Sequence, residues 1–166
     1  MTEDRKESRG ERIRRLRSGA RFHAVQALFQ MEAAGVSVDR IRRDYLGWRL
    51  GRRVDVEDEV APEVDEALFD ALLDDAVTWQ GRIDQMTDRA LVAKWPIARI
   101  DPVLRAVFRA AGAEMIGQPD TPPKVIITEY LRVAQSFYDE GREGKLVNAV
   151  LDHMAREARP DAFPAG

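Results

Sequence analysis

Apolar residues recur every three or four positions along most of this 166-residue chain, which is the spacing of amphipathic α-helices. No stretch alternates apolar and polar residues with the β-branched enrichment that marks a strand. Repeated sequence blocks and low-complexity segments are also absent from the chain. The sequence therefore predicts an all-α protein, a single-domain helical bundle of about six or seven helices.

Capping signals give the expected helix boundaries. Ser18 can cap a first helix that ends at Gly35, and Asp101-Pro102 is a sharper start signal, since Asp accepts free amide protons and Pro needs none. A second, shorter helix is expected from Val38 to Trp48. Residues 49–62 are predicted to form a loop.

The second half of the chain carries longer apolar stripes. Pro62 can open a helix that continues to Met86, with a bend or break near Gly81. The helix after Thr121-Pro122-Pro123 is apolar on several sides, so we expect it to be the central helix. A final helix follows the turn at residues 140–144.

Charge is segregated along the chain and suggests its division. Residues 1–21 hold eight Lys or Arg against four acids, whereas residues 54–81 hold ten Asp or Glu and no basic residue. We expect a basic flexible arm at residues 1–17, a helical domain at 18–159 and a flexible tail at 160–166. Two oppositely charged regions suggest two faces with different partners, although charge runs also serve simply to solvate helices.

Few residues suit catalysis. The chain has no cysteine, and His23 and His153 lie in different predicted helices without the spacing of metal ligands. Asp74 and Asp75 are adjacent and would point apart on a helix. We therefore predict no catalytic site, no metal, no cofactor and no enzymatic activity. No segment is long and apolar enough for a membrane span or a secretory signal, which predicts a cytoplasmic protein.

Nucleic-acid binding is better supported by the residues. The arm and the start of the first helix carry closely spaced arginines, which suit phosphate contacts and stacking on exposed bases: Arg12, Arg14, Arg15, Arg17 and Arg21. The alternative is that an arginine-rich end acts only as a solubilising tail.

Three ordered blocks carry a family resemblance. They are RFHAVQALFQ at residues 21–30, the block from Ile100 to Met115, and residues 122–152, which contain KVIITE and LVNAVLD. Together they resemble the NusB family of bacterial antitermination factors. LVNAVLD is the strongest of the matches, and the family usually has Phe where this chain has Leu146.

The resemblance implies an all-helical, non-enzymatic RNA-binding protein. Such a protein would pair with the ribosomal protein NusE, bind boxA-type single-stranded RNA and join the RNA polymerase antitermination complex on ribosomal RNA operons. By matching positions, RNA contacts would come from the arm, including Arg17 and Arg21. They would also come from four further residues: Arg105, Lys124, Lys145 and Leu146. Phe29 and Asp101 would face the protein partner.

Several alternatives stay open at this point. A helical protein–protein adaptor would use only the side of the molecule that carries Phe29 and Asp101. A divergent member of the family would bind RNA weakly and without sequence preference. The sequence does not choose between a monomer and a homodimer. The same helical domain also begins some ribosomal RNA cytosine methyltransferases, but we expect no enzyme here because no βαβ region for S-adenosylmethionine follows.

Overall fold

The computed structural model describes residues 5–46, 64–91, 100–138 and 142–163. These residues form seven α-helices and one short 3-10 helix, and they contain no strand. The all-α prediction is thus confirmed. The predicted loop at 49–62 and the residue Pro62 lie outside the described residues.

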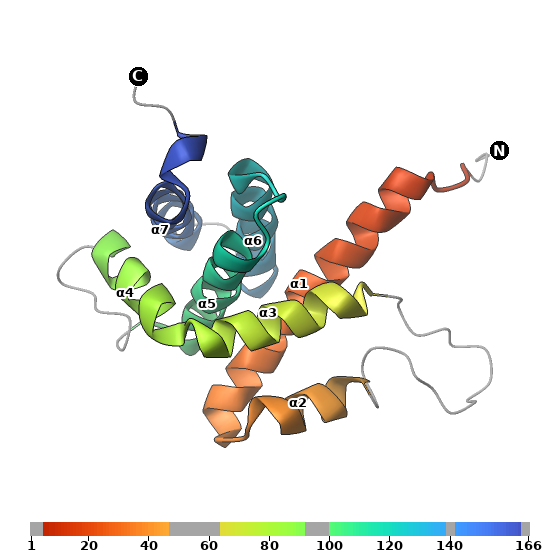
Figure 1. Cartoon of the computed structure of the whole chain (residues 1–166), viewed down its shortest axis with the longest axis horizontal. Helices are drawn as coiled ribbons and strands as arrows, with labels where there is room; N and C mark the ends of the chain where they lie inside the picture. The colour runs from red at the N-terminus through yellow and green to blue at the C-terminus, as the bar shows by residue number, and fades with distance from the viewer. Residues whose placement is uncertain (1–4, 47–63, 92–99, 139–141, 164–166) are drawn as a thin grey trace.

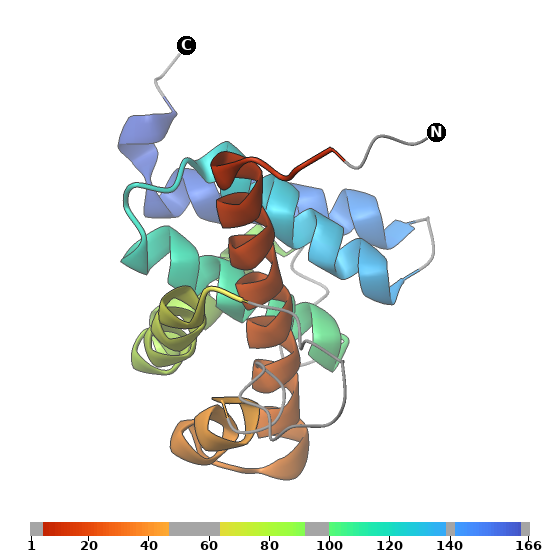
Figure 2. The same cartoon turned by 90° about the vertical axis from the view of Figure 1, so that its right-hand side faces the viewer.

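Seven α-helices follow one another along the chain: α1 (Arg9–Ala34), α2 (Val38–Asp44), α3 (Glu66–Thr78), α4 (Gln80–Ala90), α5 (Pro102–Gly117), α6 (Pro123–Phe137) and α7 (Arg142–Ala158). The short 3-10 helix η3 (Pro160–Ala162) follows α7. α1 crosses the molecule diagonally, and its first turns project past the other helices (Figure 1). α6 and α7 run alongside each other near the N-terminal half of α1 (Figure 2).

The first helix begins ten residues earlier than predicted. Ser8, not Ser18, is its N-cap, and the Ser8 hydroxyl accepts a hydrogen bond from the Glu11 amide at 3.1 Å. Arg15 donates two hydrogen bonds to Glu7, at 2.7 and 3.0 Å, across the first turns. The segment expected to be a flexible arm is therefore helical from Arg9 onward. The helix ends as predicted, at Gly35, whose φ of 65° places it in the left-handed region that favours glycine.

The predicted helix from Pro62 to Met86 is two helices. α3 begins after Asp65, whose carboxylate accepts the Leu68 amide at 2.9 Å, and it ends at Thr78. The break falls at Trp79, two residues before the predicted position at Gly81. The chain turns there, and α4 then packs against α5 and α7.

The central helix is α5, not α6 as predicted. α5 packs against α1, α3, α4, α6 and α7. Ten of its residues are buried, including four alanines and Gly112, whereas α6 has four buried residues. Small side chains let the neighbouring helices approach α5 closely. Helices can therefore pack against α5 on several sides although it has few large apolar residues.

The tail is partly structured. Arg159 donates hydrogen bonds to backbone oxygens at the end of α5 and in the following turn, including Met115 at 2.9 Å. The Met115 carbonyl has no amide to accept from four residues on, because that position is Pro119, so a distant arginine caps the end of α5. The guanidinium carbon of Arg156 lies 4.6 Å from the centre of the Phe163 ring. Residues 160–163, expected to be flexible, therefore form η3 and an ordered contact.

Gly112 and Gly81 give a matched test of this packing. A Cβ at Gly112 would lie 2.5 Å from Cγ2 of the buried, β-branched Ile83, whereas a Cβ at Gly81 would meet nothing within 4 Å. We predict that Gly112→Ala lowers the free energy of unfolding by about 1–3 kcal/mol because Ile83 cannot move easily. Gly81→Ala should raise it by about 0.5–1 kcal/mol because alanine favours the helix. Urea unfolding measures both, and equal effects would contradict the packing.

Candidate nucleic-acid interface

The N-terminal half of α1 presents arginines to solvent. Arg12, Arg14 and Arg15 are exposed, and Arg17 is half-buried. Arg14 has no hydrogen bond or ion pair to another described residue. Arg17 donates to the hydroxyl of Thr121 at 3.3 Å and lies 3.6 Å from Asp65. The segment predicted to be an arm is thus the exposed surface of a helix. One of its arginines, Arg17, also contacts residues near α3 and α6.

Arg21 is not on this surface. It was predicted to contact RNA, but its side chain is 3% exposed, and it forms a two-pronged ion pair with the fully buried Glu114 of α5. Both shorter contacts measure 2.8 Å, from Nε to Oε1 and from Nη2 to Oε2. Glu129 of α6 lies 3.7 Å away. A guanidinium engaged in this way holds α1 to α5 and α6 and does not offer a free hydrogen-bonding edge to RNA.

Tyr130 and Ser18 extend the buried network. The Tyr130 hydroxyl donates to Glu114 at 2.9 Å, and the Ser18 hydroxyl donates to Glu129 at 2.8 Å. Burial, followed by the negative charge of Glu114, raises the pKa of Tyr130 well above its ordinary value, so Tyr130 remains a donor at neutral pH. The network fixes the middle of α1 and thereby the position of the exposed arginines.

A groove of about 530 Å³ lies between the first half of α1 and the start of α6. Arg14 and Arg17 line one side together with the exposed Ile13, and Pro122 and Val125 line the other. The buried Arg21 and two acids also border the groove: Asp120 and Glu129. Lys124 lies in the same first turn of α6 and is exposed. Cations and apolar side chains therefore share one surface, which suits phosphate and base contacts of a single strand.

Lys145 and Leu146 lie at a different place. They are exposed in the first turns of α7, which follows α6 after a short link and runs back alongside it (Figure 2). Lys124 is at the opposite end of α6, and 15 helical residues span about 22 Å. The predicted basic residues therefore form two groups separated by the length of α6, and not one compact patch.

Arg105 belongs to neither group. Its guanidinium donates to Glu32, at 2.9 Å from Nε, and to the Ile100 carbonyl at 3.4 Å. Arg109, one turn on, contacts Glu32 at 3.2 Å and Asp84 at 2.9 Å. The hydrogen bond from Arg105 lowers the pKa of Glu32, and the cluster pairs two arginines with two carboxylates.

Phe29, one of the two residues predicted to face a protein partner, lines an apolar depression of about 300 Å³, and Asp101 is not among the lining residues. Phe29, Val103 and Phe137 line it, and the Phe137 ring stacks on Phe22 with centroids 5.7 Å apart. Asp101 is the N-cap of α5 and accepts the Val103 amide at 2.8 Å. Phe137 was not predicted as a site residue; its place at the end of α6 was the signal that it could be exposed.

The described residues contain no group of three or more His, Cys, Asp or Glu side chains placed to hold a metal ion. His23 packs edge-on against Phe22 and Tyr45, while His153 is exposed on α7. Within the described part of the chain, no helix has the length and hydropathy of a membrane span.

Comparisons with known proteins identify similar sequences and a matching family. The NusB family model matches residues 18–156. The transcription antitermination protein NusB of Maricaulis maris is 40% identical over 158 residues, covering 95% of this chain and 97% of its own length. Its counterpart in Mesorhizobium japonicum is 43% identical over 143 residues, covering 86% and 90%.

Solved structures share the fold. The structure of T. maritima NusB matches with a TM-score of 0.69 at 26% identity, covering 88% of this chain and 95% of its own. A structure of the antitermination factors NusB and NusE in complex with double-stranded RNA matches with a TM-score of 0.64 at 22% identity, covering 84% and 96%.

We predict that Glu114→Ala lowers the free energy of unfolding by about 3–5 kcal/mol, because it leaves the Arg21 charge buried without its main partner. The control is the triple variant Arg21→Met, Glu114→Leu, Tyr130→Phe, which removes every polar member that depends on Glu114. It should lose far less stability, since apolar replacement of a whole buried pair is often neutral. Urea unfolding compares them. A small loss in Glu114→Ala would show that the pair does not hold α1.

Proposed function

This chain belongs to the NusB family, and on that premise we propose that it acts as a transcription antitermination protein that binds RNA together with a protein partner. The observation that carries the RNA part is the groove between α1 and α6, where Arg14, Arg17 and Ile13 face Val125. The proposed RNA is a boxA-type single strand in the transcript of a ribosomal RNA operon.

Two sets of residues divide the proposed work on RNA. Arg12, Arg14, Arg15 and Lys124 are exposed cations that contact phosphates and set the register of the strand. Lys145 and Leu146, at the far end of α6, contact a later part of the same strand. Leu146 offers apolar contact to a base without aromatic stacking. Arg21 contributes indirectly, by fixing α1, and Arg105 contributes through its ion pair with Glu32.

The proposed protein partner is the ribosomal protein NusE, which is present with NusB in the structural neighbour. Its site on this chain is the apolar depression formed by Phe29, Val103 and Phe137. Aromatic side chains that are partly exposed around such a depression are typical anchors of protein interfaces. Asp101 adds a negative charge at its edge. The assembled pair would then join the RNA polymerase antitermination complex in the cytoplasm, without enzymatic activity.

We predict that the double variant Arg14→Ala, Lys124→Ala weakens binding to boxA RNA and to a scrambled RNA by similar factors. Phosphate contacts carry no sequence information, so both RNAs should lose affinity alike. The slope of log affinity against log salt should become shallower by about 1.4, which corresponds to two lost contacts with a single strand. Fluorescence anisotropy at several salt concentrations, with the partner present, measures affinity and slope.

Arg43→Ala is the matched control for charge. Arg43 is an exposed arginine on α2, on another part of the molecule. Its loss should leave both affinity and slope unchanged. If Arg43→Ala, which removes one charge, caused half of the double variant's change in log affinity, only total charge would matter and the groove would be rejected as the site.

We predict that Phe29→Ala weakens binding to purified NusE by at least about thirtyfold, the effect of losing a central aromatic anchor. Ile13→Ala, an equally accessible apolar truncation on the arm, should leave it unchanged without RNA. Asp101→Asn isolates the charge, because asparagine keeps the N-cap of α5. Isothermal titration calorimetry measures all three. Unchanged binding by Phe29→Ala would place NusE elsewhere.

A further inference from the structure

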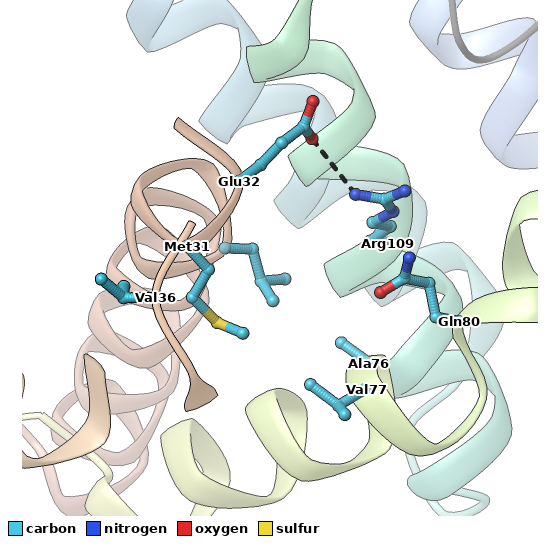
Figure 3. Close-up of a pocket in the computed structure, with 8 residues that line it drawn as sticks. Met31, Glu32, Val36, Ala76, Val77, Gln80 and Arg109 are labelled. Carbon is cyan, nitrogen blue, oxygen red and sulfur yellow. Dashed lines mark hydrogen bonds and ion pairs between the residues drawn. The ribbon is translucent and has the colours of Figure 1, made fainter. Parts of the chain in front are cut away.

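A second pocket lies on the side of the molecule away from the arginine arm. It has a volume of about 290 Å³ and is enclosed by the last turns of α1, the junction of α3 with α4, and the middle of α5. Figure 3 shows Met31 facing Ala76 and Val77 across it, with Val36 behind Met31 and with Glu32, Arg109 and Gln80 at the edge. The residues used by the proposed RNA and NusE sites do not line it.

The floor of this pocket is apolar and its charged edge is already paired. Leu28, Met31, Val36, Ala76 and Val77 supply the apolar surface. Arg109 forms ion pairs with Glu32 and Asp84. The charges at the edge of the pocket are therefore already neutralised, and a ligand needs no charged group to pair with them. An engineered apolar cavity of roughly 150 Å³ holds benzene, which means that this pocket has room for one large apolar side chain.

The pocket is distinct from the depression around Phe29. Both are lined by the second half of α1, but Leu28, Met31 and Glu32 lie on one face of that helix and Gln26 and Phe29 on another. A partner bound at Phe29 would therefore leave the second pocket open.

The surroundings of the pocket are acidic. α3 contains four carboxylates and no basic residue, and Asp70, Asp74 and Val77 are spaced four and three residues apart, on one face of the helix. Arg42 of α2 faces this row and is bonded to Asp39, Asp70 and Asp74 together, so one cation stands against three carboxylates there. α2 also carries the exposed Arg40 and Arg43, and α2 and α3 together hold six carboxylates against three arginines.

We propose that this pocket binds a segment of another protein that carries one large apolar side chain flanked by Lys or Arg. The apolar side chain enters between Met31 and Val77, and the basic neighbours lie along Asp70 and Asp74. An acidic border repels RNA, so nucleic acid does not compete for this site. The alternative occupant is the arm of a second copy of this chain, in which Ile13 lies among arginines. The test must distinguish this occupant from a segment of another protein.

The probe is a short dye-labelled lysine-rich peptide with one central leucine. Two control peptides are compared with it. In the first, serine replaces the leucine; in the second, glutamate replaces the lysines. Fluorescence anisotropy with the full chain should show binding of the first peptide, weakened by salt, and little binding of the other two. Equal binding of the serine peptide would overturn the proposal, because the pocket would then contribute nothing.

Val77→Lys and Val125→Lys are matched variants. Val77 is 43% exposed beside the pocket and Val125 is 41% exposed on the arm groove, so both accept lysine without burying it. Val77→Lys should weaken binding of the leucine peptide by about tenfold or more, while Val125→Lys should not. Equal effects of the two would overturn the assignment.

Two further measurements complete the test. Asp74→Asn should reduce the salt dependence of peptide binding, whereas Asp152→Asn, an exposed acid on α7, should not. Sedimentation velocity of the unliganded variants addresses the second copy. If Val77→Lys dissociates a self-associated species and leaves peptide affinity unchanged, the face belongs to a second copy and the proposal is wrong.

Discussion

The ion pair between Arg21 and Glu114 determines where the functional surfaces lie. It joins α1 to the centre of the bundle, and Tyr130 and Glu129 connect the same charges to α6. A buried pair costs desolvation, and once formed it tolerates little displacement, because either charge left alone in the interior is strongly unfavourable. The helix that carries the exposed arginines therefore has a fixed angle and register relative to the groove that it borders.

Periodicity and capping residues were sufficient to predict the fold class. The start of α5 at Pro102 and the end of α1 at Gly35 followed from side-chain chemistry that acts within a few residues. The early start of α1 was missed because residues 9–17 carry few apolar groups, and a helix held by arginine propensity, a Ser8 cap and local ion pairs has no apolar stripe there. The central place of α5 was missed because alanines contribute little to a pattern of large apolar residues.

The functional residues divide in the same way. The exposure of Arg14 and Lys124 could be predicted because a charged side chain outside an apolar stripe is exposed for reasons of local sequence alone. Arg21 could not be separated from them, since its partner Glu114 is 93 residues away in the chain and only the packed bundle brings the two together. The same holds for the depression around Phe29, which exists because Val103 and Phe137 arrive from two other helices.

α1 is one uninterrupted helix of 26 residues, about 39 Å long, and it is gripped near its middle by Arg21. Its first turns border the basic groove and its last turns border the apolar pocket. α1 also packs against α3 and α5 on either side of Arg21, so it cannot pivot and its two ends keep a constant separation. Arg14 and Met31 are 17 helical residues apart, so the occupants of the two cavities are held about 26 Å from each other along one helix.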